Sequence, residues 1–262
     1  MYRSPLTLVP VLLFAAAGLL VSAIDGARAE RLTTLLEASD TRVPVTRPTF
    51  GDARAGERER MVRRQIEHRG VRDPRVLAVL RELPRHEFVP PGIRGRAYAD
   101  RPQPIGHGQT ISQPYIVGFM TEQLELEPGD RVLEVGTGSA YQAAVLAQLV
   151  RHVVSIEIIE PLARSAAERL RRLGFRNVTV LHGDGYYGYR AEAPYDAIIV
   201  TAAATHVPPP LVAQLKPGGR MVIPVGRSGW TQNLLLVEKD AGGEVSTRNL
   251  LAVSFVPLTG DH

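Results

Sequence analysis

From residue 131 onward, short apolar runs alternate with longer stretches in which apolar residues recur every three or four positions. The short runs predict buried strands, and the longer stretches predict helices that cover them. The predicted strands are Arg131–Val135, Val153–Ile156, Val178–Leu181, Asp196–Val200, Met221–Pro224, Asn233–Val237 and Leu250–Val256. The predicted helices are Tyr141–Val150, Pro161–Leu173 and Leu211–Leu215, the last of which ends at Lys216–Gly219. This alternation is typical of a doubly wound α/β fold with a mostly parallel sheet.

The chain before residue 131 has helical periodicity and irregular connections instead. Charged residues alternate with apolar ones over Glu57–His68, which predicts an amphipathic helix ended by Gly70. Asp73 before Pro74 predicts the cap and first residue of a second helix. Prolines and glycines then predict an irregular connection over residues 90–108.

That connection leads into a turn rich in hydroxyl and amide groups, within the stretch GHGQTISQPYIVGFMTEQL. Ser112 in this turn has three interpretations. A nucleophilic serine needs a general base, for which His86 and His107 are candidates, but no G-x-S-x-G elbow surrounds it. A serine shortly before Pro114 is also typical of a helix cap. The third interpretation is a clamp for a charged group of a substrate.

The N-terminus has the pattern of an export signal. Arg3 precedes an uncharged apolar run from Leu6 to Ile24, and Ala27-Arg28-Ala29 offers a cleavage site. Residues 1–29 are therefore predicted to be signal-peptide-like, with an uncleaved anchor as one alternative and a translation start at Met61 as another. Residues 30–55 contain several prolines and glycines and predict a tether of low order.

The amino-acid composition excludes several kinds of reactive site and binding partner. The 262 residues include no cysteine, which excludes disulfides, thiolate nucleophiles and cysteine-ligated zinc. The formal net charge is +4, but the arginines are spread among acidic residues rather than gathered in a stripe. This spread favours a solvated surface over nucleic-acid binding.

Glycines and acidic residues follow the first three predicted strands. Gly136 and Gly138 follow the first strand, where backbone can approach a ligand closely. Glu157 ends the second strand, about twenty residues on, where a carboxylate can bind ribose hydroxyls. Asp184 and Gly185 follow the third strand, where an aspartate can meet the adenine amine. Because carboxyl ends of parallel strands share one edge, these residues predict a crevice for an adenosine cofactor.

The electrostatics of this segment favour one cofactor. Tyr141 occupies the position of the third glycine in the dinucleotide fingerprint, and no G-K-[ST] phosphate cradle is present. Glu134 places a carboxylate beside the turn, where it would repel a pyrophosphate. It would suit the sulfonium and amino groups of S-adenosylmethionine. An alternative role for Glu134 is to hydrogen-bond the N–H groups of the turn itself.

Several segments resemble the protein-L-isoaspartate O-methyltransferase family. They are RHEFVP, GHGQTISQPYIVGFMTE, LEVGTGSAYQAA, VVSIE, LHGDG, APYDAIIVTAAATHVPPPLVAQLKPGGRMVIPVG and FVPLTG, and together they span about Met61 to Gly260. The glycine-turn segment alone indicates an S-adenosylmethionine-dependent methyltransferase, and GQTISQPY narrows the resemblance to the isoaspartyl branch. One departure is Ala140, where the family commonly has glycine.

The resemblance implies a Rossmann-like class I methyltransferase domain over residues 56–262, with an N-terminal helical substrate-side region over 56–127. It implies methyl transfer from S-adenosylmethionine, without a metal, to the free α-carboxylate of L-isoaspartyl and D-aspartyl residues. The methyl ester would then collapse to a succinimide and hydrolyse partly to normal aspartate, which repairs age-damaged proteins and peptides.

The resemblance also implies roles for individual residues. Ser112 is the catalytic residue, and Thr259 helps to close the site near the methyl donor. The lid between cofactor and substrate is implied to contain Thr110, Ile111, Gln113, Pro114 and Tyr115.

Three questions stay open in the sequence. The alternative functions are methylation of another carboxylate, an NAD-dependent oxidoreductase and a binding module without catalysis. We expect a monomer without a nucleic-acid or stable membrane partner. Cofactor supply and the family resemblance predict the cytoplasm, whereas the signal-like segment favours the periplasm.

Overall fold

The computed structural model describes residues 47–51, 53–227 and 229–261. The signal-like segment 1–29 and most of the predicted tether, residues 30–46 and 52, lie outside the described residues. Within the described part of the chain, no helix is both long and apolar enough to cross a membrane.

A seven-stranded sheet forms the centre of the domain, in the order β5-β4-β3-β6-β7-β8-β9. Its strands are β3 (Arg131–Val135), β4 (His152–Glu157), β5 (Val178–His182), β6 (Tyr195–Val200), β7 (Leu215–Val225), β8 (Gln232–Lys239) and β9 (Val245–Val253). The first five are parallel, and β8 runs antiparallel to both of its neighbours, β7 and β9. The predicted doubly wound, mostly parallel sheet is therefore confirmed, and its strand order reverses between β3 and β6.

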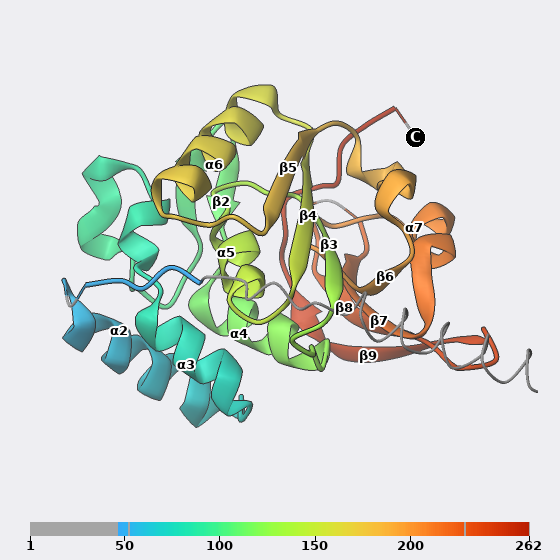
Figure 1. Cartoon of the computed structure of the whole chain (residues 1–262), viewed down its shortest axis with the longest axis horizontal. Coiled ribbons are helices and arrows are strands. Elements are labelled where there is room, and N and C mark those ends of the chain that lie inside the picture. Colours follow the sequence, from blue (N-terminus) through green and yellow to red (C-terminus); the bar gives the residue numbers. More distant parts are fainter. Residues whose placement is uncertain (1–46, 52, 228, 262) are drawn as a thin grey trace, which may run out of the picture. The chain divides into compact units, whose positions relative to one another are not determined.

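Helices cover both faces of this sheet (Figure 1). The helices α4 (Pro114–Gln123), α5 (Tyr141–Ala147) and α6 (Glu160–Arg172) lie on one face. There they enclose a core with the inward side chains of the strands, such as Val132 and Val153. The helix α7 (Pro209–Gln214) covers Leu133 and Ile198 on the opposite face. Burial of both faces explains why the central strands are apolar throughout rather than alternating.

The N-terminal helical region packs beside α4. The predicted helix over Glu57–His68 is present, but as α2 (Ala55–Met61) followed by a π-helical turn (Val62–Ile66) and a 3-10 turn (Glu67–Arg69). Asp73 caps α3 (Pro74–Glu82) as predicted, since its Oδ1 accepts a hydrogen bond from the Arg75 N–H at 2.8 Å. Gly70 ends the preceding turn with a positive φ of 103°.

The connection over residues 90–108 is more regular than predicted. It contains a 3-10 helix (Pro91–Arg96), and its end forms a two-stranded hairpin of β1 (Gln103–Gly106) and β2 (Gln109–Ile111). The hairpin was missed because its strands are short and contain proline and glycine. It places Ser112 directly after β2.

Two predicted boundaries at the C-terminal end are wrong. The last strand covers Val245–Val253 rather than Leu250–Val256. It is an edge strand whose first half is exposed and polar, so hydrophobicity does not reveal where it begins. Leu215 and the Lys216–Gly219 turn belong to β7, not to the end of the preceding helix. The segment after β9 instead returns over the sheet, where Pro257 pairs with Ala203.

Candidate active site

The glycine turn after β3 is closely packed from behind. Gly136 has a positive φ of 96°, and a Cβ atom on it would lie 2.5 Å from the Oγ1 atom of Thr201. That hydroxyl donates to the carbonyl oxygens of Gly136 at 2.6 Å and Val135 at 3.1 Å. Both the backbone conformation and the space therefore require glycine here.

The Glu157 carboxylate binds the backbone of the glycine turn. This residue ends β4, is only 5% exposed, and accepts hydrogen bonds from the N–H groups of Gly138 at 2.7 Å and Ile159 at 2.9 Å. Each carboxylate oxygen uses one lone pair in these bonds and keeps another. Glu157 can therefore fix the turn and still accept hydrogen bonds from the hydroxyls of a ligand.

Glu134 supports the turn and is not among the residues that line the pocket at the turn. Its predicted contact with the cofactor stays a prediction. Glu134 is fully buried, and its Oε2 accepts a hydrogen bond from the Ser155 hydroxyl at 2.5 Å. Ser155 in turn lies 2.6 Å from the Thr137 hydroxyl within the turn. Burial raises the pKa of Glu134 to about 8, with a smaller contribution from the charge of Glu157. Glu134 thus supports the turn through Ser155 and Thr137, which is close to the alternative role considered for it.

The predicted cofactor residues converge on one pocket at the ends of β3, β4 and β6. This glycine-turn pocket is lined by Gln109, Thr110, Val135, Gly136, Gly138, Ile156, Glu157, Ile158, Ile159, Gly185, Thr201, Ala202, Val256, Pro257, Leu258 and Thr259. Gly136, Gly138, Glu157, Gly185 and Thr259 are all predicted site residues, and the fold brings them together. The switch in strand order beside β3 is where open α/β sheets bind ligands.

Asp184 lies next to this pocket. Its Oδ1 accepts a hydrogen bond from the Tyr186 N–H at 2.9 Å, at the start of a 3-10 turn (Gly185–Tyr187). Gly260, at the end of the returning C-terminal segment, lies directly against the Asp184 carboxylate. The segment is held over the sheet because the Leu258 N–H donates to the carbonyl of Ala203 at 2.8 Å.

A second, larger cavity of about 450 Å³ contains Ser112. This Ser112 pocket is lined by Arg69, Pro102, Thr110, Ser112, Gln113, Tyr115, Ile116, Thr201, Thr231, Leu251, Ala252, Val253, Ser254, Phe255 and Val256. Thr110, Thr201 and Val256 also line the glycine-turn pocket. A small cleft between the two is lined by Ser112, Gly136 and Gly138 together. The predicted catalytic serine therefore borders the predicted cofactor turn.

Ser112 is not the cap of α4, so that interpretation is wrong. The N-cap residue is Gln113, and no side chain among the described residues caps the helix. The Ser112 carbonyl accepts a hydrogen bond from the Arg85 guanidinium at 2.6 Å. No hydrogen bond of the Ser112 hydroxyl occurs within residues 47–51, 53–227 and 229–261. Ser112 lies two residues before the first residue of α4, and the first N–H groups of a helix have no partner within the helix.

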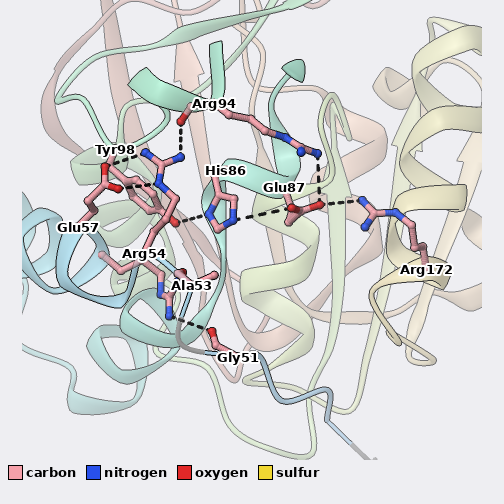
Figure 2. Close-up of polar contacts among 10 residues, drawn as sticks. Gly51, Ala53, Arg54, Glu57, His86, Glu87, Arg94, Tyr98 and Arg172 are labelled. Atoms are coloured by element: carbon pink, nitrogen blue, oxygen red, sulfur yellow. Dashed lines mark hydrogen bonds and ion pairs between the residues drawn. The ribbon is translucent and has the colours of Figure 1, made fainter. Parts of the chain in front are cut away.

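The nucleophile interpretation gains no support from the two candidate bases. His86 Nδ1 lies 2.6 Å from the Tyr98 hydroxyl, in a polar network that also contains Arg54 and Glu87 (Figure 2). Burial lowers the pKa of His86, which favours its neutral form. Neither His86 nor His107 lines any of the three cavities around the glycine turn and Ser112.

The remaining lid residues have different positions. Thr110, Gln113 and Tyr115 line the Ser112 pocket, and Ile111 is buried beside the small cleft. Pro114 is buried at the first position of α4. Gln113 donates to Asp100 at 2.7 Å, which fixes its amide.

Sequence reasoning missed two residues of this site, Thr201 and Arg69. Thr201 follows β6 and borders both pockets, as its place after a strand could have indicated. The Arg69 guanidinium lies 3.7 Å above the ring of Tyr115 and lines the Ser112 pocket. Ala140 adopts a positive φ of 67° and is fully buried. Its left-handed conformation explains why glycine is common there, because a side chain adds strain.

Three comparisons with known proteins agree with this geometry. Residues 56–262 match the family model described as protein-L-isoaspartate(D-aspartate) O-methyltransferase. The chain is 65% identical over 190 residues to protein-L-isoaspartate O-methyltransferase 1 of Cupriavidus necator, covering 72% of this chain and 73% of that protein. It is 59% identical over 218 residues to protein-L-isoaspartate O-methyltransferase 2 of Syntrophobacter fumaroxidans, covering 81% of this chain and 88% of that protein.

Two solved structures share the fold. One protein-L-isoaspartate O-methyltransferase aligns with a TM-score of 0.69 at 31% identity, over 78% of this chain and 66% of that chain. The structure described as the Plasmodium falciparum enzyme in complex with S-adenosyl-L-homocysteine aligns with a TM-score of 0.67 at 26% identity, over 77% and 98%. With matches across most of the chain at these levels, this protein belongs to the protein-L-isoaspartate(D-aspartate) O-methyltransferase family.

Proposed function

We propose that this chain transfers a methyl group from S-adenosylmethionine to the free α-carboxylate of L-isoaspartyl and D-aspartyl residues in damaged proteins. Family membership gives the class of reaction. The structural observation that carries the proposal is the cleft lined by Ser112, Gly136 and Gly138, because it joins a cofactor pocket to an acceptor pocket.

The glycine-turn pocket has the donor set and the shape for the cofactor. Gly136 leaves no room for a side chain, so backbone itself faces the ligand. Glu157 has acceptor capacity for the ribose hydroxyls, and Asp184 is assigned to the adenine amine. Thr259 and Gly185 close the pocket around the ligand. When bound, S-adenosylmethionine supplies a methyl group on a positively charged sulfur.

Ser112 acts as a clamp in this proposal. The acceptor carboxylate is ionised at pH 7, with a reference pKa of about 3.5–4, so it needs no general base. It needs alignment with the methyl carbon at about 3 Å and the exclusion of water. The Ser112 hydroxyl and free N–H groups of α4 hold one carboxylate oxygen and leave the other to react. Thr110, Ile111, Gln113, Pro114 and Tyr115 shape the surrounding lid.

We also propose a monomer that acts in the cytoplasm, where S-adenosylmethionine is made. The signal-like segment 1–29 favours the periplasm instead, and N-terminal sequencing of the native protein decides between the two. Among the described residues, no group of three or more histidine, aspartate or glutamate side chains could hold a metal ion.

The test compares two peptides that differ only in the linkage of one aspartyl residue. Purified protein with labelled S-adenosylmethionine should methylate the isoaspartyl peptide and leave the normal aspartyl peptide unlabelled. Calorimetry with S-adenosylhomocysteine should show binding. Equal labelling of both peptides would indicate another carboxylate substrate, and absence of binding would remove the cofactor assignment.

A further inference from the structure

Arg85 is an arginine in an unusual place, the interior of the domain. Its side chain is fully buried, and its guanidinium lies 4.8 Å from the centre of the Tyr141 ring. Its Nε donates to the Ala97 carbonyl at 2.8 Å, and its Nη2 donates to the Ser112 carbonyl at 2.6 Å. The partners of the cation are therefore two backbone carbonyls and an aromatic face.

Such an arrangement is costly for the stability of the domain. Burial lowers the pKa of Arg85, because the interior disfavours its charged form. Within the part of the chain that the structure describes, no carboxylate pairs with it, and its Nη1 has no hydrogen-bond partner. Tyr141 is also fully buried, and its interaction with the guanidinium partly offsets the effect of burial on the pKa of Arg85. A buried cation that lacks a carboxylate partner is destabilising to the fold. The benefit of Arg85 must therefore lie elsewhere.

The neighbours of Arg85 hold its backbone firmly. His86 contacts the Tyr98 hydroxyl, and Glu87 forms ion pairs with Arg94 at 3.5 Å and Arg172 at 3.2 Å (Figure 2). Arg172 belongs to α6, so the segment is attached to the cofactor-binding part of the domain. The backbone that carries the Arg85 side chain is therefore fixed, and so is the point from which this side chain extends to Ser112.

The contacts of Arg85 lie on both sides of the active site. Ser112 lines the acceptor pocket, and Tyr141 is the first residue of α5, which follows the glycine turn. Ser112 and Tyr141 also line the same small cleft. The guanidinium donates a hydrogen bond to the Ser112 carbonyl and lies over the ring of Tyr141. The Arg85 guanidinium thus contacts both Ser112 and the helix that follows the glycine turn, and it can fix the distance between them.

We propose that Arg85 is a positioning residue for methyl transfer, which sets the distance between Ser112 and the glycine turn. This inference rests on the proposed role of Ser112. An arginine suits the task because its planar fork serves two acceptors in fixed directions, whereas a lysine is a point charge on a flexible stem. A displacement of about 1 Å at a reacting group can cost about 10²-fold in rate.

Arg85→Lys tests the inference, and Arg58→Lys is its matched control. Arg58 is also buried, at 3% exposure, and its Nε donates a hydrogen bond to the Arg81 carbonyl at 2.8 Å. Unlike Ser112 and Tyr141, the contacts of Arg85, it lines none of the pockets described above. Both variants keep the charge, and both should lower Tm. Arg85→Lys should reduce kcat at saturating isoaspartyl peptide by at least about tenfold, with the Kd for S-adenosylhomocysteine changed by less than about threefold. Arg58→Lys should keep kcat within about twofold of the unaltered protein.

Tyr141→Leu provides a second measurement if Arg85→Lys fails to fold. It removes the aromatic face but leaves both carbonyl bonds of Arg85, and it should lower kcat in the same selective way. Equal kcat values for the two lysine variants, or a loss in Tyr141→Leu confined to cofactor affinity, would overturn the inference. Failure of the unaltered protein to methylate any isoaspartyl peptide would instead remove the proposed function.

Discussion

The hydroxyl of Ser112 is the group on which the proposed clamp depends. Ser112→Ala removes it while leaving the carbonyl that binds Arg85 in place. The variant should bind S-adenosylhomocysteine normally and lose methyl transfer by roughly 10²-fold or more, because alignment is lost only for the acceptor. Calorimetry and a peptide methylation assay measure the two quantities separately.

Ser254→Ala is the control for this change, since Ser254 lines the same pocket and is exposed. It should keep most of the activity. If Ser112→Ala turned over the isoaspartyl peptide as fast as the unaltered protein, the hydroxyl would have no part in the reaction.

Glu134 makes the stability of the folded domain depend on pH, and the direction of this dependence follows from its raised pKa. Its folded pKa of about 8 lies above its ordinary value of 4.5, so the folded state holds one more proton between these pH values. Its contribution to stability is complete below about pH 4.5 and is lost as the pH rises through 8. Glu134→Gln keeps the shape of the protonated acid and does not titrate.

The difference in free energy of unfolding between Glu134→Gln and the unaltered protein should therefore shift in favour of the variant, by about 1.3 kcal/mol from pH 6 to 7 and about 1 kcal/mol from pH 7 to 8. Urea denaturation at pH 6, 7 and 8, without cofactor, measures this difference. A difference that stays constant with pH would show that Glu134 is ionised in the folded protein across the range.

At the scale of elements, the returning C-terminal segment closes the glycine-turn pocket. Gly260 lies against Asp184, so that a Cβ on Gly260 would lie 2.6 Å from the carboxylate carbon. Gly260→Ala should push the two segments apart and weaken S-adenosylhomocysteine binding by about tenfold or more, equivalent to about 1.4 kcal/mol. Gly129→Ala is the control, because nothing lies within 4 Å of a Cβ there. Equal affinities for the two variants would show that this closure does not contribute to binding.

For the molecule as a whole, the question is where the functional domain begins. Val45–His262 forms one compact unit. Just inside its start, the Phe50 ring packs 6.1 Å from that of Phe175, and the Pro48 carbonyl accepts a hydrogen bond from Gln148 at 3.0 Å. Arg54 then pairs with Glu57 at 2.6 Å. The last residues of the predicted tether therefore contact the domain.

Two truncations separate these parts. Removal of residues 1–44 should leave Tm and kcat unchanged. Removal of residues 1–54 should lower the free energy of unfolding by on the order of 2–4 kcal/mol, because the contacts of Phe50, Pro48 and Arg54 are lost. Thermal unfolding of both proteins provides the measurement. Equal stability of the two would move the start of the domain to residue 55 or beyond. A start at Met61 would in addition delete the buried Arg58.

Residues that are close together in the sequence were sufficient to predict much of the candidate site. Glycines after a strand, and acidic residues at the ends of the next two, predict a crevice because parallel strands end at one edge. Sequence could not predict that Glu134 is fully buried and bonded to Ser155, since the side of a strand that becomes buried depends on which helix packs there. It could not predict the role of Arg85 either, because its partners Ala97 and Ser112 are 12 and 27 positions away.

The sequence by itself determined the succession of strands and helices along the chain after residue 131, the glycine turn and the class of cofactor. These depend on periodicity and on residues close together in the chain, where the physics is local. Only the tertiary structure decided that Ser112, Thr201 and the C-terminal segment border the glycine turn. Such contacts join residues far apart in the chain, and they form only when the two faces of the sheet are buried together.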